Sequence, residues 1–503
     1  MNDTSDPYER LPYAGEAYAQ THPNRIGTIA ALFGMRPAHV PCCRVLELGC
    51  GFGGNLIPMA EQWPSARFVG LDLSERAVAH GRAIVRAVGL RNIELRHGDI
   101  LDVRPGAGEF DYIIAHGVYS WVPDPVRRKV WAICREGLAP HGVAFVSFNA
   151  LPGGHRRRIM RELMQYHTRA ISDPVEKVRQ ARAICAHLAG CAGGGLYGEV
   201  LREELERIEA RDAPLYHDDL SPENRAFLLQ DVVEAAEAAG LQYLGEATLA
   251  HSNVGILPPF AAGTLAQIPE EAFALREQYL DFLFGRNFHQ SLWCRSEIAL
   301  NRSIETATVA RLHVAENEAS NVPGGHGGPK ARDRRRTDGR SRAPESATDT
   351  DRLLEAALAQ VCACAPQAVP FASVLRGVLE RLRQSNVKLA APERAEPSLA
   401  AALLGAYRAN RIELWLDAPA IAPCVTERPR ASRIARYQAW AKTRVTNLRH
   451  ANVNLDEAQR QCLLLADGSR DVHDIAASLA AAGKDRGAKA LLEELARLAL
   501  LAA

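Results

Sequence analysis

Short apolar segments alternate, over the first 150 residues, with longer segments whose apolar residues recur at helical spacing. Ser74 is placed to cap one such helix, whose apolar residues from Val78 to Val88 line one face before Gly89 ends it. This alternation predicts a doubly wound parallel sheet with ligands at the carboxyl ends of its strands. The expected strands are 44–50, 67–73, 93–99, 110–117 and 142–149.

After residue 155 the pattern becomes helical and charged, and strand-like segments return only at 240–250 and 291–300. We interpret these two segments as a sixth and a seventh strand, the seventh antiparallel, that follow a helical insertion. Such an insertion covers the strand ends, where a substrate must be selected. The predicted fold class is therefore α/β, a Rossmann-like sheet of seven strands with a helical insertion.

The chain changes character between Pro323 and Arg352, where it has no Leu, Ile, Val, Met or aromatic residue and carries the basic run RDRRRTDGRSR. This stretch cannot bury a core, so we expect a flexible linker. The expected domains are 1–155, the core; 156–305, which completes the sheet; 306–350, the linker; and 351–503, a helix-rich domain. The domain 351–503 has one clear strand, at 411–419, and a winged helix is one candidate for its fold.

Composition excludes several classes of protein. A net charge of +1 over 503 residues gives no global attraction to nucleic acid or membranes. The N-terminus lacks the pattern of a signal peptide and there is no apolar run of 18 residues, so we expect a cytoplasmic protein without membrane insertion. The eleven cysteines form no CxxC pair, which favours free thiols and no metal site.

The stretch RVLELGCGFGGN, residues 44–55, fits two cofactor fingerprints. Its glycines satisfy the GxGxxG of dinucleotide enzymes, and Glu47 with Gly49, Gly51 and Gly53 satisfies the ExGxGxG of S-adenosylmethionine (SAM) methyltransferases. A carboxylate at 47 would attract the sulfonium and ammonium of SAM, whereas it would repel a pyrophosphate. Glu47 therefore favours SAM.

Polar residues at three further strand ends support this interpretation. Asp72 suits the ribose hydroxyls of either cofactor. Asp99 can accept from the adenine amine while Ile100 covers the ring, and His116 ends the fourth strand beside the expected position of the sulfur. The order of these residues favours SAM over NAD. Two neighbours of these motifs complete the predicted cofactor site: Asn55 and Leu73.

The motifs RVLELGCGFGGNLIPMA, FDYIIAHGVYSWVP and REGLAPHGVAFVSFNALPGG resemble bacterial SAM-dependent methyltransferases that carry a methyltransferase regulatory domain. GLQYLGEA and YLDFLFGRNFHQSLWCR resemble the regulatory segment, and the stretch from ARYQAWAK to DVHDIAASL resembles the family's C-terminal domain. The family includes lysine methyltransferases that act on outer-membrane surface proteins. The resemblance implies a protein substrate, such as an outer-membrane protein before its export. It is also compatible with a homodimer.

Transfer to lysine requires a neutral amine, and neutralising one near pH 7.4 costs about 4 kcal/mol. A partly dry aromatic pocket beside the sulfonium would lower the pKa of the amine. We predict Tyr119 and His116 as catalytic residues. For His116, a contact with the cofactor is favoured over a direct catalytic role. A histidine at 22 equally suits a cap for the helix after Pro23. The predicted substrate-binding residues are Tyr13, Tyr18, His22 and Trp121.

Three alternatives stay open. The basic run from Arg428 to Arg449, with Tyr437 and Trp440, could bind nucleic acid, although acidic neighbours favour a solvated or protein-docking surface. A small-molecule methyltransferase would not need the extra domains. A protein that binds SAM only to regulate a partner is the third.

Overall fold

The computed structural model describes residues 15–208, 215–253, 255, 257–317, 348–483 and 486–503. The chain divides into two compact units, the first made of Met1–Ile26, Cys42–Ala247 and Val254–Ala299. The second unit is made of Gly27–Pro41, Thr248–Asn253 and Leu300–Ala503. Within the described ranges, no helix is long and apolar enough to cross a membrane.

The first unit is built on a sheet with the strand order β3-β2-β1-β4-β5-β8-β7, and the short β6 pairs with β5. β8 lies between β5 and β7 and runs antiparallel to both, which confirms the predicted seven-stranded fold with its antiparallel strand. The two-residue β6 was not predicted, because so short a segment has no periodicity of its own. The strands are β1 (Arg44–Leu48), β2 (Arg67–Asp72), β3 (Ile93–His97), β4 (Phe110–Ala115), β5 (Leu138–Ala150), β6 (Ala226–Phe227), β7 (Leu241–Glu246) and β8 (Phe288–Arg295).

Helices cover the sheet. Ser74 caps α4 as predicted, by accepting from the amide of Ala77, and Gly89 ends this helix with φ at +70°. Apolar side chains of α4, among them Val78 and Ile84, are buried. The helices that follow or precede strands in this unit are α3 (Leu56–Gln62), α4 (Glu75–Val88), α5 (Asp124–Gly137), α10 (Leu229–Glu237), α11 (Pro259–Leu265) and α12 (Phe273–Phe284).

The two faces of β5 carry different contacts. Because side chains alternate along a strand, Phe145 and Ser147 point to one face and Phe148 to the other. Ser147 and Phe145 contact the His116 ring, so we call this side the His116 face. The ring of Phe148 contacts Tyr119, so we call the opposite side the Tyr119 face.

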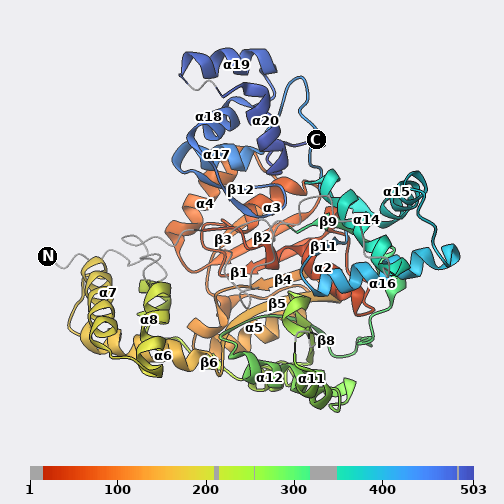
Figure 1. The fold of residues 1–503 in the computed structure, drawn as a ribbon. Coiled ribbons are helices and arrows are strands. Elements are labelled where there is room, and N and C mark those ends of the chain that lie inside the picture. The colour runs from red at the N-terminus through yellow and green to blue at the C-terminus, as the bar shows by residue number, and fades with distance from the viewer. Residues whose placement is uncertain (1–14, 209–214, 254, 256, 318–347, 484–485) are drawn as a thin grey trace. The chain divides into compact units, whose positions relative to one another are not determined.

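The helical insertion consists of α6 (Gly154–His167), α7 (Pro174–Cys191) and α8 (Leu196–Ile208), which lie side by side (Figure 1). Their apolar faces form a small core of their own. Asp219 is buried beside this core and pairs with Arg157 and Arg207, and these two guanidinium groups hold the pKa of the carboxyl below its ordinary value despite burial.

The second unit contains a three-stranded antiparallel sheet with the order β10-β9-β11. Its central strand, β9 (His313–Glu316), and the short α13 (Thr306–Val309) lie inside 306–350, so the first part of the expected linker is folded. Residues 318–347 lie outside the described residues, and 348–350 contain the cap and the first residues of a helix. The other elements of this part are α14 (Asp349–Cys364), β10 (Val369–Pro370), α15 (Phe371–Gln384), α16 (Ala395–Arg408) and β11 (Ile412–Trp415).

The last part of the second unit is four helices and a two-stranded hairpin around one apolar core. The hairpin was not predicted, because each of its strands has only three residues and the surrounding sequence is basic. The elements are α17 (Arg433–Ala441), β12 (Arg444–Thr446), β13 (Asn452–Asn454), α18 (Glu457–Leu465), α19 (Val472–Ala481) and α20 (Ala488–Arg497).

Candidate functional site

A loop of glycines follows β1 and is held in place by the neighbouring strand. Asp72, at the end of β2, accepts from the amide of Gly51 at 2.7 Å and from the amide of Ser74 at 2.9 Å. Gly51 has φ at +55°, and a Cβ built there meets no atom within 4 Å. The backbone therefore borders open space where a ligand can approach closely, and its conformation is one that favours glycine.

Glu47, the penultimate residue of β1, is buried and incompletely paired. Its Oε1 accepts from Asn55 Nδ2 at 2.8 Å, whereas its buried Oε2 has no hydrogen-bond partner in the described part of the chain. Burial raises the pKa of Glu47 to about 8, and repulsion from Asp72 adds to this rise. A buried carboxylate with an open oxygen fits a cationic ligand, which would stabilise its ionised form.

The segment before α2 (Pro23–Leu32) lies against the glycine loop. A Cβ at Gly54 would lie 2.6–2.7 Å from the backbone of Gly15, so the two stretches of backbone are in contact. The amide of Tyr18 donates to Asn55 Oδ1 at 3.0 Å, and Asn55 Nδ2 also donates to Thr21 Oγ1. Asn55 thus connects the segment to Glu47, and its predicted contact with the cofactor stays a prediction.

His22, predicted to bind substrate, has another role in the structure. Its Nδ1 accepts from the amide of Asn24 in the first turn of α2, and its Nε2 lies 2.9 Å from Gln62 Oε1. Both ring nitrogens therefore have partners within the protein, as the helix cap requires, and the substrate contact of His22 stays a prediction. Tyr13, a second predicted substrate residue, lies outside the described residues.

Residues at the ends of β2 and β3 provide the predicted adenine end of the site. Asp99 follows β3 and its Oδ1 accepts from the amide of Leu101 at 2.9 Å, which fixes the start of a short turn. Ile100 is half-buried, and the Leu73 side chain is 70% exposed although it is large and apolar. An exposed leucine beside the carboxylate of Asp72 suits a flat ring with polar edges, so these assignments stand as proposals.

His116 follows β4 on the His116 face, where the Tyr18 ring lies 4.2 Å from its ring, centroid to centroid. Ser147 Oγ lies 2.9 Å from its Nδ1 and accepts from the amide of Gly117. The hydroxyl has a second acceptor lone pair as well as its proton, so the contact with Nδ1 fits either neutral tautomer of the ring. Burial lowers the pKa of His116 to about 4, so the ring is neutral at pH 7.

Phe288 and Phe145 complete an aromatic surround that the sequence analysis missed. Their ring centroids lie 6.2 Å and 5.8 Å from that of His116. Phe288 is the first residue of β8 and is paired with Asn149 at the end of β5. The motif GRNFHQSLW could have signalled it, because an antiparallel β8 brings its first residue to the carboxyl ends of the parallel strands.

Tyr119, a predicted catalytic residue, lies on the face of β5 opposite the His116 ring, so the structure does not bring these two predicted catalytic residues together. Tyr119 is 3% exposed, its ring contacts Trp131, Phe148 and Phe227, and its hydroxyl accepts from Trp131 Nε1 at 3.1 Å. The loop after β4 turns through a short 3-10 helix, Tyr119–Trp121, and carries this ring across the sheet edge. Trp121 is half-buried, and its substrate contact stays a prediction.

Several basic residues of the run from Arg428 to Arg449 serve the fold. Arg449 is buried and pairs with Glu413 of β11 at 2.9 Å, and Arg436 lies 3.7 Å from Asp467. Arg428 donates to the carbonyl of Ser469. The positive charges that would bind phosphates are thus partly neutralised, which argues against the nucleic-acid alternative.

Three family models match the chain: "Methyltransferase domain" at 45–142, "Predicted methyltransferase regulatory domain" at 211–295, and "PKMT, C-terminal winged helix domain" at 427–498. The last of these covers the four helices and the hairpin of the second unit. Together with the glycine loop and the strand order, these matches define a SAM-dependent methyltransferase with SAM as its cofactor.

Similar proteins come from Rickettsia. RP789 of Rickettsia prowazekii is 35% identical over 63% of this chain, and the match spans 58% of that relative's length. RP028 of the same organism is 31% identical over 46% of this chain and 93% of its own. The structure of PKMT2 from Rickettsia typhi in complex with AdoHcy has a TM-score of 0.81, 26% identity, and covers 97% of this chain and 100% of that one. The chain belongs to this family of methyltransferases with a regulatory domain.

Proposed function

We propose that the protein transfers methyl groups from SAM to lysine side chains of a protein substrate. The observation that carries this proposal is the likeness of nearly the whole chain, the winged helix included, to PKMT2, whose abbreviation stands for protein lysine methyltransferase. A methyltransferase of small molecules needs no such additional domains. An outer-membrane protein is the substrate that the resemblance of the motifs suggests.

The cofactor site would be formed by Glu47, the glycine loop and Asp72. Glu47 Oε2 would face the positive end of SAM, and the amides fixed by Asp72 would let the backbone approach it. Leu73, Asp99 and Ile100 would bind the adenine end. The bound cofactor supplies a methyl group made electrophilic by the sulfonium, so the protein's task is mainly to position the two reactants.

The acceptor pocket would lie at the His116 face, between the rings of Tyr18 and Phe288. Rings on two sides exclude water from a lysine amine and thereby lower its pKa, as the neutral nucleophile requires. Burial lowers the pKa of His116 to about 4, so the ring is a weak base and would orient groups rather than take the proton. The amine would lose its proton to solvent as it enters.

Labelling tests this proposal. The full chain is incubated with SAM carrying a radioactive methyl and with protein fractions of a lysate, the outer-membrane fraction included. We expect labelled protein bands that disappear when the lysines of the fraction are first blocked by exhaustive acetylation. Label in small molecules only, or label that persists after the lysines are blocked, would contradict the proposal. The matched enzyme control is Gly51→Val, which should label nothing.

A further inference from the structure

The helix α12 buries polar side chains and leaves apolar ones exposed. Glu277, Gln278 and Asp281 are buried on the side that packs against the protein, beside the apolar Phe273 and Leu280. Residues at helical spacing on the other side are 43–53% exposed although they are large and apolar: Leu275, Tyr279, Phe282 and Leu283. Apolar packing alone therefore does not hold α12 in place, and its buried charges need partners.

His289 of β8 is the partner that joins α12 to the neighbouring strand. Its Nδ1 lies 3.0 Å from Oε1 of Glu246, the last residue of β7, and its Nε2 lies 2.8 Å from Oδ2 of Asp281. An ionised carboxylate only accepts hydrogen bonds, so a ring that faces one at each nitrogen is favoured in its doubly protonated form. Burial alone would lower the pKa of His289, but the two carboxylates outweigh this effect and raise it to about 9. The ring is therefore a buried cation at pH 7.

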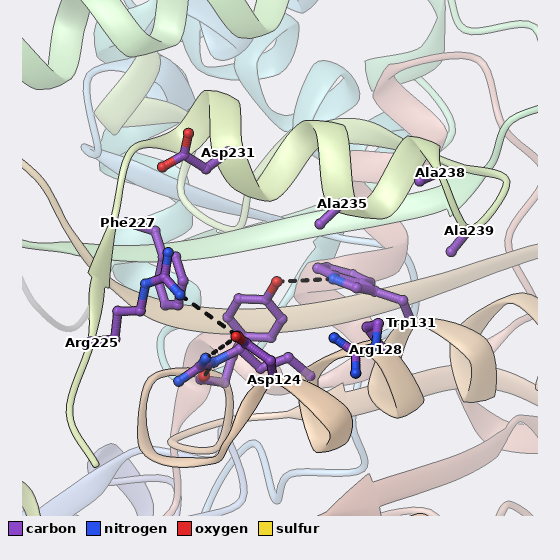
Figure 2. A pocket seen from close by; sticks show the side chains of 11 residues that line it. Asp124, Arg128, Trp131, Arg225, Phe227, Asp231, Ala235, Ala238 and Ala239 are labelled. Carbon is purple, nitrogen blue, oxygen red and sulfur yellow. Dashed lines mark hydrogen bonds and ion pairs between the residues drawn. The ribbon is translucent and has the colours of Figure 1, made fainter. Parts of the chain in front are cut away.

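The described residues around this imidazolium form a buried cluster of charged groups. Besides Glu246 and Asp281, the cluster includes Glu277 of α12 and the guanidinium of Arg286, whose Nε lies 3.1 Å from Asp281 Oδ1. The hydroxyl of Tyr243 donates to Glu246 Oε1 at 3.0 Å. A cavity of about 430 Å³ lies on the same face of the sheet, between α5 and α10, but no member of the cluster lines it (Figure 2). Loss of the imidazolium charge would thus leave the guanidinium to balance three buried carboxyl groups.

The start of β8 carries His289 on one face of the sheet and Phe288 on the other. The His289 ring lies 4.9 Å from that of Phe148, on the Tyr119 face. One residue earlier, the ring of Phe288 lies 6.2 Å from that of His116. Phe148 is paired with His289, and the next residue of β5 is paired with Phe288. A shift at His289 therefore moves Phe288, because consecutive residues of a strand share one backbone.

We propose that His289 is a positioning residue for methyl transfer: held between Glu246 and Asp281, it fixes the start of β8 and thereby the ring of Phe288 beside His116. This inference rests on the acceptor pocket proposed above. It also gives a physical role to the region that matches the regulatory-domain model, 211–295, since this region contains β7, α12 and β8. The region shapes the acceptor pocket through one buried cation.

Histidine NMR tests the positioning without a methyl acceptor. The full chain carries carbon-13 at the histidine Cε1 atoms, and the signals are assigned with His116→Gln and His289→Gln. His116 stays neutral from about pH 7 to 10, because its pKa is about 4. We expect its signal to shift nevertheless with a midpoint near pH 9, together with that of His289, as the ring of Phe288 moves. In Phe288→Leu, which has no ring, the step should be small.

At pH 7 the signal of His116 should also differ between the parent chain and His289→Gln. The matched control is Arg295→Gln, because Arg295 is a cation at the other end of β8 that donates to the carbonyl of Leu138. That variant should keep the signal at the position of the parent chain, and thermal melts establish that each variant is folded. A His116 signal without a step in the parent chain, or a step that persists in His289→Gln, would overturn the proposal.

Methylation rates separate positioning from stability. Labelling of the outer-membrane protein fraction at saturating SAM should fall about ten- to a hundredfold per folded molecule in His289→Gln, the loss that a small misplacement of a reacting group produces. SAM affinity, measured by calorimetry, should stay unchanged, and Arg295→Gln should label as the parent chain does. An unchanged rate in folded His289→Gln would overturn the proposal. Absence of labelling by the parent chain would instead contradict the proposed function, and the NMR series would still decide whether His289 positions Phe288.

Discussion

Asn55 Nδ2 donates to Glu47 Oε1 over 2.8 Å and also to Thr21 Oγ1, so Asn55 joins the carboxylate at the end of β1 to the segment that precedes α2. The same side chain accepts the amide of Tyr18, whose ring lies against His116. One buried amide therefore couples the proposed cofactor end of the site to the proposed acceptor pocket. Its removal should affect both ends at once.

Asn55→Ala should lower SAM affinity by about tenfold, the size of one lost hydrogen bond in a buried network. Calorimetric titration of the purified variant measures this. The matched control is Asn92→Ala, because Asn92 Nδ2 donates to three carbonyls in and after α3, those of Ala60, Trp63 and Ala66. That variant should melt at a lower temperature yet bind SAM normally. Equal affinities in the two variants would contradict the coupling.

Binding of SAM should release a proton through Glu47. The pKa of this carboxyl is raised to about 8, so it is largely protonated at pH 7 without cofactor, and a cation beside it favours the ionised form. Titrations at pH 7 in buffers of different ionisation enthalpy measure the release. In Glu47→Gln the release should fall by the contribution of this group, and an unchanged value would place the cation away from residue 47.

The same carboxyl makes the stability of the cofactor-free protein depend on pH. Between its ordinary pKa of 4.5 and about 8, the folded state holds a proton that the unfolded state has lost. The free energy of unfolding should therefore decrease as the pH rises through this window, and the decrease should be smaller in Glu47→Gln. Denaturant unfolding at pH 5.5 and 7.5, compared between the two proteins, tests the sign.

Gly51→Val should abolish SAM binding while the protein still folds. The substitution places a side chain in the open space beside the loop and adds about 1–3 kcal/mol of backbone strain at positive φ. Gly285→Val is a matched control, since Gly285 has φ at +59° and open space around its Cβ but ends α12. It should lose similar stability and keep SAM affinity. Loss of binding in both variants would assign the effect to strain alone.

Tyr119→Phe should leave methyl transfer per folded molecule unchanged. It removes the acceptor of the Trp131 indole and should cost about 1–3 kcal/mol of stability. Tyr18→Phe retains the ring beside His116 and serves as the comparison for the proposed acceptor pocket. Melts and rates measured together separate the effects, and a large loss of turnover in stable Tyr119→Phe would restore its predicted catalytic role.

The sheet and the polar strand ends were predictable because each rests on local periodicity. The apolar segments of β1 to β5 are bounded by turns, and the departure of Glu47 from an apolar pattern is visible without a structure. The face occupied by Tyr119 was not predictable, because a short turn after β4 decides on which side of the sheet its ring lies. β9 was missed for a related reason: its four residues are paired with β11, about a hundred residues away.

His22 shows the same limit at the level of one side chain. Its sequence position suits a substrate contact or a helix cap equally, and only the structure shows that its ring nitrogens meet Gln62 and the amide of Asn24. Phe288 was overlooked because its importance depends on the antiparallel register of β8 with β5. Residues whose role depends on distant pairing thus escaped the sequence analysis, whereas residues at strand ends did not.

The most direct test of lysine methylation is tandem mass spectrometry of a protein substrate after reaction with SAM that carries a deuterated methyl group. We predict heavy methyl groups on lysine side chains, present with the parent chain and with Gly285→Val and absent with Gly51→Val. Heavy methyl groups on other residues, or on small molecules alone while every lysine stays unmodified, would contradict the account.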